Sequence, residues 1–231
     1  KVFDQIDILD FESTDNIYQY VSIGKEDAPF NGHFDGNGVH IKLNINNNDD
    51  YQGLFGFIGQ NGTVRQVSVS GSIQGGNYVG GIAGYNQGLI EQVYNQASIN
   101  ALDYTGGIVG YHDGIIQNAY NRGEVIGQST VGGIAGYSDN HIRHTYNTGV
   151  IYGKDTVGAL VGFLNTDLII NSYYDTRVLY AYRSYGAYIK PEAGVSNSVN
   201  SETVKGLDKT LMTGAEAIGS GSFKMDFTSQ S

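Results

Sequence analysis

Short apolar stretches alternate with glycine and asparagine along most of the chain, and this pattern returns at a fixed interval. The stretch VGGIAGYNQGLIEQVYN begins at Val79, TGGIVGYHDGIIQNAYN begins at Thr105, and VGGIAGYSDNHIRHTYN begins at Val131, so each copy follows the last after 26 residues. A looser copy covers residues 53–73, and a later copy slips by one residue at 167–171. Consecutive copies of this kind indicate a repeat protein.

Within each copy, the apolar residues have the spacing of extended chain. No apolar run recurs at i, i+3, i+4 and i+7 over three turns, and β-branched and aromatic residues stand between glycines and asparagines. Such a unit cannot bury its apolar side alone and must stack on its neighbours. The repeat therefore predicts an all-β fold, a parallel β-helix (β-solenoid) of roughly six to eight coils with about 26 residues each.

Stacking the copies places like residues in columns, which become ladders of touching side chains in a β-helix. The clearest ladder columns are Gly80, Gly106, Gly132 and Gly158; Tyr85, Tyr111, Tyr137 and Phe163; and Asn95, Asn121 and Asn147. The glycines are expected either at corners with positive φ or where opposite walls approach closely.

One local feature is specific enough to test. Ile116 and Ala119 both stand in columns of apolar or small residues, so both should point inward. Inward positions on one flat strand differ by an even number, whereas these two differ by three. We therefore expect a corner or bulge at Asn118. The same bend is expected at the other residues of its column: Gln66, Gln92 and His144.

The flanks differ from the repeat, although all parts are expected to form one structural domain. Residues 1–50 are expected to hold an N-terminal cap and the first coil, with an Asp-Gly-Asn-Gly turn at 35–38 before an alternating strand at 39–45. Residues 51–175 are the repeat coils. Residues 176–231 are expected to cap the other end, where 211–219 could form a short helix, because an open coil is an aggregation edge.

Composition excludes several classes of protein. Of 231 residues, 40% are hydrophobic, which supports a globular core, and 34 glycines without a three-residue period exclude collagen. The net charge of −10 argues against a nucleic-acid partner. No cysteine is present for disulfides or thiolate metal sites, and no apolar stretch approaches the ~20 residues of a membrane span, so membrane insertion is not expected.

Asp113 and Asp139 are weak candidates for catalysis. Both occupy one turn column, and neighbouring coils would place them about 5 Å apart, which suits the acid/base pairs that cleave polysaccharides. A weak calcium site is a second interpretation, and plain turn residues are the third and simplest, because aspartate favours turns. No catalytic residue is assigned beyond this pair, and no cofactor is expected.

Two further segments contain chemically suggestive side chains. The HIRH segment at 141–144 lacks both the glutamate and the i, i+4 histidine spacing of a zinc-binding helix, so no metal site is predicted there. In the tail, tyrosine and arginine alternate, and rings beside arginine can stack on sugars or anchor a protein partner. The candidate binding residues are Tyr180, Tyr182, Arg183, Tyr185 and Tyr188. The alternative is that these rings pack over the last coil.

The repeat resembles the GLUG-motif family of bacterial secreted and surface proteins. The GLFG at 53–56, the VGGIAGYNQGLI blocks, the AYNRGEV stretch and the FNGHFDGNG segment carry the resemblance, which covers roughly residues 28–175. The chain departs from the family in its tyrosine-rich tail and in lacking the cysteine often found where Ala119 stands. The resemblance implies β-solenoid repeats in multidomain exported proteins, including adhesin-like chains and immunoglobulin A1-specific metallopeptidases, and it supplies no catalytic residue.

Together these features favour a non-catalytic structural or adhesive module, extracellular or on a bacterial cell surface. It would act as a rigid spacer or a host-binding region. Its expected partners are other domains of the same polypeptide, with host glycoprotein or glycan in addition. No signal peptide opens the chain, so we expect either that export has removed it or that the chain is a piece of a longer protein. The alternatives are a polysaccharide-active lyase or glycoside hydrolase and a carbohydrate-binding module.

Overall fold

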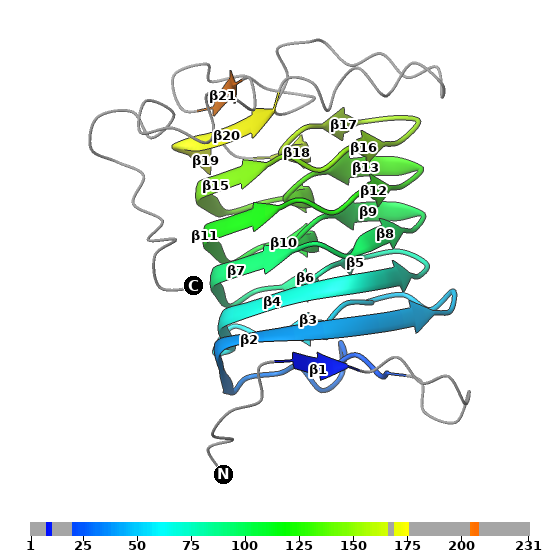
Figure 1. Ribbon diagram of the computed structural model, residues 1–231, viewed down its shortest axis with the longest axis vertical. Helices are drawn as coiled ribbons and strands as arrows, with labels where there is room; N and C mark the ends of the chain where they lie inside the picture. The colour runs from blue at the N-terminus through cyan, green and yellow to red at the C-terminus, as the bar shows by residue number, and fades with distance from the viewer. Residues whose placement is uncertain (1–7, 11–19, 166–168, 176–203, 208–231) are drawn as a thin grey trace.

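The computed structural model describes residues 8–10, 20–165, 169–175 and 204–207. Within these residues all regular structure is β-strand, and the chain winds into a β-solenoid of about five turns (Figure 1). Every pair of named strands in the described ranges is parallel. The predicted all-β parallel β-helix is therefore confirmed. The expected helix at 211–219 lies outside the described residues.

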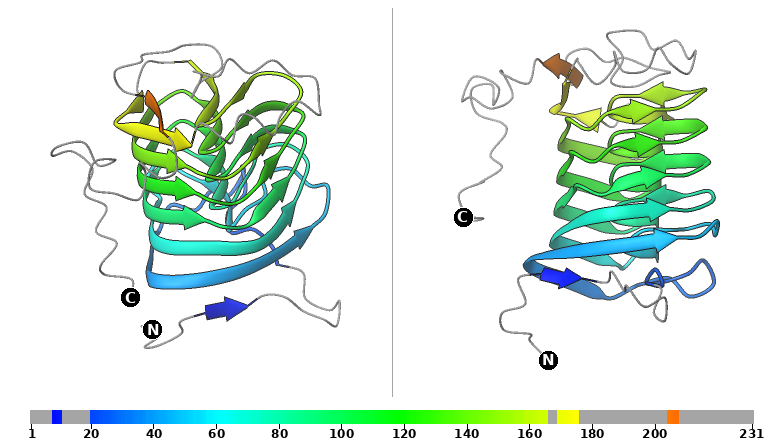
Figure 2. Two further views of the ribbon diagram at one scale, coloured as in Figure 1. Left: turned by 45° about the horizontal axis from the view of Figure 1, so that its top comes forward. Right: turned by 45° about the vertical axis from the view of Figure 1, so that its right-hand side comes forward.

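Three parallel sheets form the walls of the solenoid, and successive coils supply the strands of each sheet (Figure 2). The largest has 12 strands: β1 (Ile8–Asp10), β2 (His33–Asn46), β4 (Thr63–Gln74), β7 (Leu89–Asn95), β8 (Ser98–Asn100), β11 (Ile115–Asn121), β12 (Val125–Ile126), β15 (His141–Asn147), β16 (Ile151–Tyr152), β19 (Ile169–Ile170), β20 (Ser172–Asp175) and β21 (Val204–Leu207).

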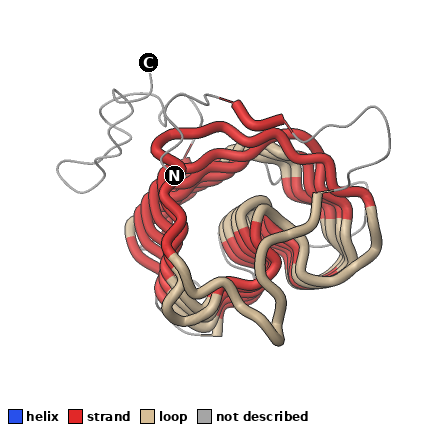
Figure 3. Tube along the Cα trace, turned by 90° about the horizontal axis from the view of Figure 1, so that it is seen from below, coloured by secondary structure: helices blue, strands red, loops and turns tan. Residues whose placement is uncertain are grey.

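The second sheet has five strands: β3 (Phe55–Ile58), β6 (Ala83–Asn86), β10 (Val109–His112), β14 (Ala135–Ser138) and β18 (Val161–Leu164). The third has four: β5 (Val79–Gly80), β9 (Asp103–Gly106), β13 (Ser129–Gly132) and β17 (Val157–Gly158). Viewed along the axis, the coils superimpose, and one part of each coil turns inward from the outline (Figure 3).

The expectation of six to eight coils was too high for the described residues. At the two ends of the stack, β1 pairs with β2 and β21 pairs with β20, both in the large sheet. Neither of these end strands belongs to the five-stranded or the four-stranded sheet. The ends therefore extend one wall of the solenoid without completing further described coils.

The sequence repeat becomes the strand register. Ile116 pairs with Ile90 on one side and with Ile142 on the other, and all three side chains are fully buried. A single cluster of buried apolar residues runs from Ile41 to Tyr174 along the inside of the described coils. The stack is therefore held by burial of like residues on like, as the columns predicted.

The predicted bend at Asn118 is confirmed. Its φ angle is 53°, and the other members of its column, Gln66, Gln92 and His144, have φ angles of 52°, 52° and 53°. This left-handed conformation turns the chain within a continuous strand, so Ile116 and Ala119 both face inward and are fully buried. Left-handed backbone costs ordinary residues roughly 1–2 kcal/mol, which packing of these two side chains offsets.

The first of the two roles expected for the repeated glycines is wrong. Among the described glycines, positive φ occurs only at Gly24, Gly38 and Gly71, none of which belongs to the column of Gly80 or to that of Gly84. The second role is confirmed by Gly110, which recurs every 26 residues with Gly84, Gly136 and Gly162. An added Cβ at Gly110 would lie 2.5 Å from the carbonyl oxygen of Tyr104 and 2.5 Å from the amide nitrogen of Val79. The repeated glycines let the walls containing β9 and β10 touch through their backbones.

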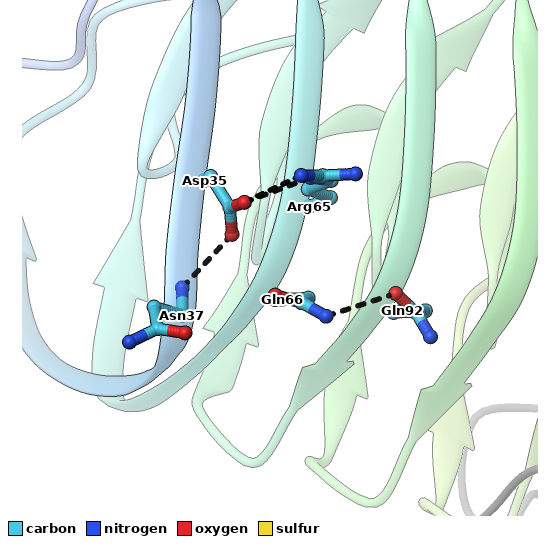
Figure 4. A network of polar contacts seen from close by, with 5 residues as sticks. All are labelled: Asp35, Asn37, Arg65, Gln66 and Gln92. Carbon is cyan, nitrogen blue, oxygen red and sulfur yellow. Dashed lines mark hydrogen bonds and ion pairs between the residues drawn. The ribbon is translucent and has the colours of Figure 1, made fainter.

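The Asp-Gly-Asn-Gly segment is a bulge and not the expected turn before the strand, because β2 continues through it. Residues 36–38 stand opposite the single residue Gln66, and the extra length is taken up by left-handed backbone at Asn37 and Gly38. The amide of Asn37 donates to the Asp35 carboxylate at 3.0 Å, and Arg65 donates to it at 2.7 and 3.0 Å (Figure 4). The hydrogen bond from Asn37 contributes most to lowering the pKa of Asp35, and Arg65 adds to it, so this pKa lies below its usual range.

Candidate functional site

The predicted aromatic ladder is present as a row of stacked rings. Centroids of Tyr85 and Tyr111 are 4.7 Å apart, and those of Tyr111 and Tyr137 are 4.6 Å apart, with ring planes within 14° of parallel. Phe163 continues the row at one end at 5.2 Å, and Phe57 continues it at the other end at 4.5 Å. The five-stranded sheet supplies all five rings, because each lies at the same position of its strand.

A second row of rings was missed by the sequence analysis. Tyr51, Tyr78 and Tyr104 stack with centroids 4.8 Å apart and planes within 7°. All three have left-handed φ angles between 52° and 58°, as have Thr130 at 54° and Thr156 at 22° in the next two coils. The 26-residue spacing of Tyr78 and Tyr104 was a usable signal. The change to threonine in the later coils hid the column.

The two rows touch along their length. Tyr104 packs against Tyr111 with centroids 5.7 Å apart and planes at 59°, and Tyr78 packs against Tyr85 at 6.4 Å and 49°. We name these eight residues the double aromatic row: Tyr51, Phe57, Tyr78, Tyr85, Tyr104, Tyr111, Tyr137 and Phe163. All of them are half-buried except Phe57, which is buried. The row therefore presents a partly exposed aromatic surface parallel to the solenoid axis.

Asp113 and Asp139 border this surface in consecutive coils, as their shared turn column predicted. The Oδ2 atom of Asp139 accepts a hydrogen bond of 2.6 Å from the Tyr111 hydroxyl, and its Oδ1 accepts one of 2.7 Å from the amide of Asn165. The carboxylate of Asp139 thus links the turns to the aromatic row. The acid/base, calcium and plain-turn interpretations of the pair all stay predictions.

Carboxylates place the double aromatic row in a negative field. Burial raises the pKa of Tyr85 to about 12, and the charges of Asp113 and Asp139 add to that rise. Burial also raises the pKa of Tyr51, with a further contribution from Glu26. The pKa of Tyr78 is raised by burial, by Tyr104 and by three carboxylates: Asp50, Glu26 and Asp103. Both rows are therefore flanked by negative charge.

A hollow of about 690 Å³ adjoins the double aromatic row at Tyr51. Its lining includes four carboxylates and one cation, together with the amide of Gln52, and the charged residues are Glu26, Asp27, Asp49, Asp50 and Lys25. This hollow extends the acidic, aromatic character of the surface toward the N-terminal end of the stack.

The asparagine ladder is wholly structural. Asn95 donates to Oδ1 of Asn121 at 2.8 Å, and Asn121 donates to Oδ1 of Asn147 at 2.9 Å, and all three side chains are fully buried. Each amide also bonds the backbone two residues further on, as when Asn121 Oδ1 accepts from the amide of Gly123 at 3.1 Å. The ladder thereby closes a turn in each coil and joins that coil to its neighbours.

One buried histidine replaces an asparagine of another column. Nδ1 of His112 accepts a hydrogen bond from the amide of Asn86 at 3.2 Å, and its Nε2 donates to the carbonyl oxygen of His141 at 3.1 Å. These partners assign the neutral tautomer with the proton on Nε2. Burial lowers the pKa of His112 to about 4. The side chain is therefore a neutral part of the core.

The remaining candidates contribute no built site in the described residues. His141 bonds the side chain of Asn140 at 2.6 Å, and His144 lies in the bend column. The described part of the chain contains no group of three or more His, Cys, Asp or Glu side chains arranged to hold a metal ion. The tail candidates lie outside the described residues: Tyr180, Tyr182, Arg183, Tyr185 and Tyr188.

No family model matches the chain, and no solved structure matches it. The chain is 42% identical over 73 residues to a protein of Evansella cellulosilytica named "Putative Gly-rich membrane protein". That match covers 29% of this chain and only 8% of the relative. Within the described part of this chain, no helix has the length and apolar character of a membrane span.

Proposed function

We propose that this chain is a rigid, non-catalytic module of a bacterial cell-surface or secreted multidomain protein, which serves as a spacer with an adhesive face. The observation that supports this most is the ladder of Asn95, Asn121 and Asn147, which ties three successive coils together through buried side chains. A solenoid whose coils are joined in this way resists bending between coils.

The repeated residues support a structural role because internal contacts already employ them. The asparagines bond one another and their own turns, and the glycines allow the walls to touch. The tyrosines of the double aromatic row stack on their equivalents in adjacent coils. Repetition at these positions is thus explained by stacking, with no need of a reaction.

The proposed location rests on two likenesses. The repeat resembles the GLUG-motif family, whose members occur in exported bacterial proteins, and the relative from Evansella cellulosilytica is named a membrane protein. A long membrane protein that contains a short stretch similar to this chain would use that stretch as one segment among several. The first partners that we propose for this chain are the other domains of the same polypeptide.

Hydrogen exchange on the full chain tests the spacer role. Amides of β7, β11 and β15 should exchange slowly and with similar protection, because opening one coil exposes the buried ladder of the next. Independent, rapid exchange of these three strands would contradict a rigid module. Labelling of intact source cells with antibodies against the chain tests the location, and labelling only after lysis would exclude surface display.

The alternative proposal is a polysaccharide-active enzyme that uses Asp113 and Asp139. It is supported by their placement in consecutive coils beside an aromatic surface, and opposed by the engagement of both Asp139 oxygens with Tyr111 and Asn165. Turnover of an acidic polysaccharide by the wild-type chain, lost in Asp113→Ala, would favour the enzyme over the spacer. A carbohydrate-binding module, the other alternative, would use the same aromatic surface to bind a polysaccharide without cleaving it.

A further inference from the structure

We propose that the double aromatic row binds a linear amino-sugar polysaccharide, which lies along the solenoid axis with its ammonium groups toward the flanking carboxylates. This inference rests on the proposed adhesive function and names the chemical class of its ligand. It is carried by the offset of the stacked rings, by their repeat distance and by the charge that surrounds them.

The stacked rings leave part of their faces open. Centroids in the row of Tyr51, Tyr78 and Tyr104 are 4.8 Å apart with planes within 7° of parallel. Carbon atoms in contact lie roughly 3.5–4.0 Å apart. Parallel rings in contact whose centroids lie 4.8 Å apart must therefore be displaced sideways relative to one another. The half-buried state of these tyrosines agrees with that offset. A strip of each ring face is therefore available to a ligand.

The rings repeat at roughly the distance between adjacent coils along one direction. Ring spacings in the row from Phe57 to Phe163 lie between 4.5 and 5.2 Å, close to the 4.8 Å of the row of Tyr51, Tyr78 and Tyr104. A ligand that contacts every ring must repeat in the same way, which favours a linear polymer whose units are about one ring long. Side chains on one face of an extended peptide recur about every 6.6 Å and fall out of register.

Charge selects among linear polysaccharides. The Tyr111 hydroxyl donates to Oδ2 of Asp139 at 2.6 Å, and Glu26, Asp49 and Asp50 line the hollow that adjoins Tyr51, so carboxylates flank both rows. The whole chain carries a net charge of −10. An acidic polysaccharide is repelled by this field, whereas an ammonium group is attracted both by carboxylates and by aromatic rings. The occupant we infer is a polymer of sugars with free amino groups.

The chain itself supplies substitutions that preserve its fold. Thr130 and Thr156 occupy the position of Tyr78 and Tyr104 in later coils, with φ angles also in the left-handed region. The double variant Tyr78→Thr, Tyr104→Thr therefore removes two rings with a residue the scaffold already accepts there. Tyr94, Tyr120 and Tyr146 form a separate row of stacked rings on the large sheet, with centroids 4.6 and 4.7 Å apart. A matched control is Tyr120→Ser in that row, where Ser68 occupies the same column.

Calorimetric titration of the full chain tests the inference with four probes: a glucosamine hexamer, its N-acetylated form, polygalacturonate and polylysine. The wild type should bind the glucosamine hexamer, the N-acetylated hexamer about tenfold more weakly, and polygalacturonate not at all. The double threonine variant should bind the glucosamine hexamer at least about tenfold more weakly, and Tyr120→Ser should bind it as the wild type does.

Four results would overturn the inference. They are no binding of the glucosamine hexamer, unchanged binding by the double threonine variant, equal affinity for the N-acetylated hexamer, and polylysine that binds as tightly and displaces the sugar. Hydrogen exchange of each variant shows whether the coils are intact. An intact, protected stack without sugar binding would refute this inference while leaving the spacer role standing.

Discussion

The side-chain amide of Asn121 donates a hydrogen bond of 2.9 Å to Oδ1 of Asn147, which lies 26 residues further along the chain, and both side chains are fully buried. Two residues distant in sequence are thus neighbours through one turn of the solenoid. The side chain of Asn121 therefore closes a turn in its own coil and also links that coil to the next one.

Asn121→Ala is expected to destabilise the protein by about 3 kcal/mol. The substitution leaves the buried partners on Asn95, Asn147 and Gly123 without their hydrogen bonds, and each unsatisfied group costs roughly 1–3 kcal/mol. Urea unfolding measures the loss. Gln117→Ala, on the partly exposed outer face, serves as the control with a loss below about 1 kcal/mol. Equal losses in both variants would contradict a special role for the ladder.

Gly110→Ala and Gly38→Ala should separate close approach from backbone strain. At Gly110 the new Cβ would lie 2.5 Å from the Tyr104 carbonyl oxygen, so the walls must shift, and we expect a loss of about 3 kcal/mol. At Gly38 nothing lies within 4 Å, but φ is 83°, so we expect the roughly 1–2 kcal/mol cost of left-handed backbone. Thermal unfolding of the two variants gives the comparison. A milder effect at Gly110 than at Gly38 would refute the packing account.

Protonation of His112 should destabilise the fold in acid. Its pKa is about 4 in the folded state, below the roughly 6.5 of an unfolded histidine, so the unfolded state binds more protons between these values. The free energy of unfolding should therefore fall from pH 6.5 toward pH 4, by about 3 kcal/mol in all from this group.

The variant His112→Asn, which copies Asn86 of the same column, tests this pH dependence. Urea unfolding across that pH range should give a flatter profile in the variant than in the wild type. His33→Asn changes an exposed histidine and provides the control. An identical slope in the wild type and in His112→Asn would assign the acid sensitivity to other groups.

Thr130→Tyr should extend the row of Tyr51, Tyr78 and Tyr104 by one ring. The new ring would stack on Tyr104 one coil away, and aromatic pairs contribute roughly 0.5–1.5 kcal/mol beyond burial, so we expect a gain of about 1 kcal/mol. In Thr156→Tyr the new ring would lie next to Thr130 of the preceding coil, which has no ring to stack on, so we expect a smaller gain in stability. Calorimetric melting compares the two, and a larger gain at 156 would contradict row extension.

The parts of the fold set by periodicity could be predicted from the sequence. The 26-residue interval requires equivalent residues to stack, which placed Tyr85, Tyr111 and Tyr137 in a row. The odd spacing of Ile116 and Ala119 located the left-handed bend at Asn118, because two inward side chains three residues apart cannot share a flat strand.

Features set by the path of the coil could not be predicted in the same way. The role of Gly110 depends on how closely β9 and β10 approach each other, which the column alone does not specify. The bulge at Asn37 resembles a turn in sequence, and pairing with β4 keeps it within a strand. The row of Tyr51, Tyr78 and Tyr104 was hidden because threonine replaces tyrosine in later coils.

Disulfide trapping tests the in-register stack most directly, since the chain has no cysteine of its own. Gln66 and Gln92 lie in adjacent coils with their side chains in contact at 3.3 Å (Figure 4). Adjacent coils place equivalent Cα atoms about 4.8 Å apart, within the range a disulfide spans, whereas two coils separate them by about 10 Å. The account predicts that Gln66→Cys, Gln92→Cys forms an intramolecular disulfide on mild oxidation and that Gln66→Cys, Asn118→Cys does not. Ready cross-linking of the second pair, or none of the first, would contradict the stack.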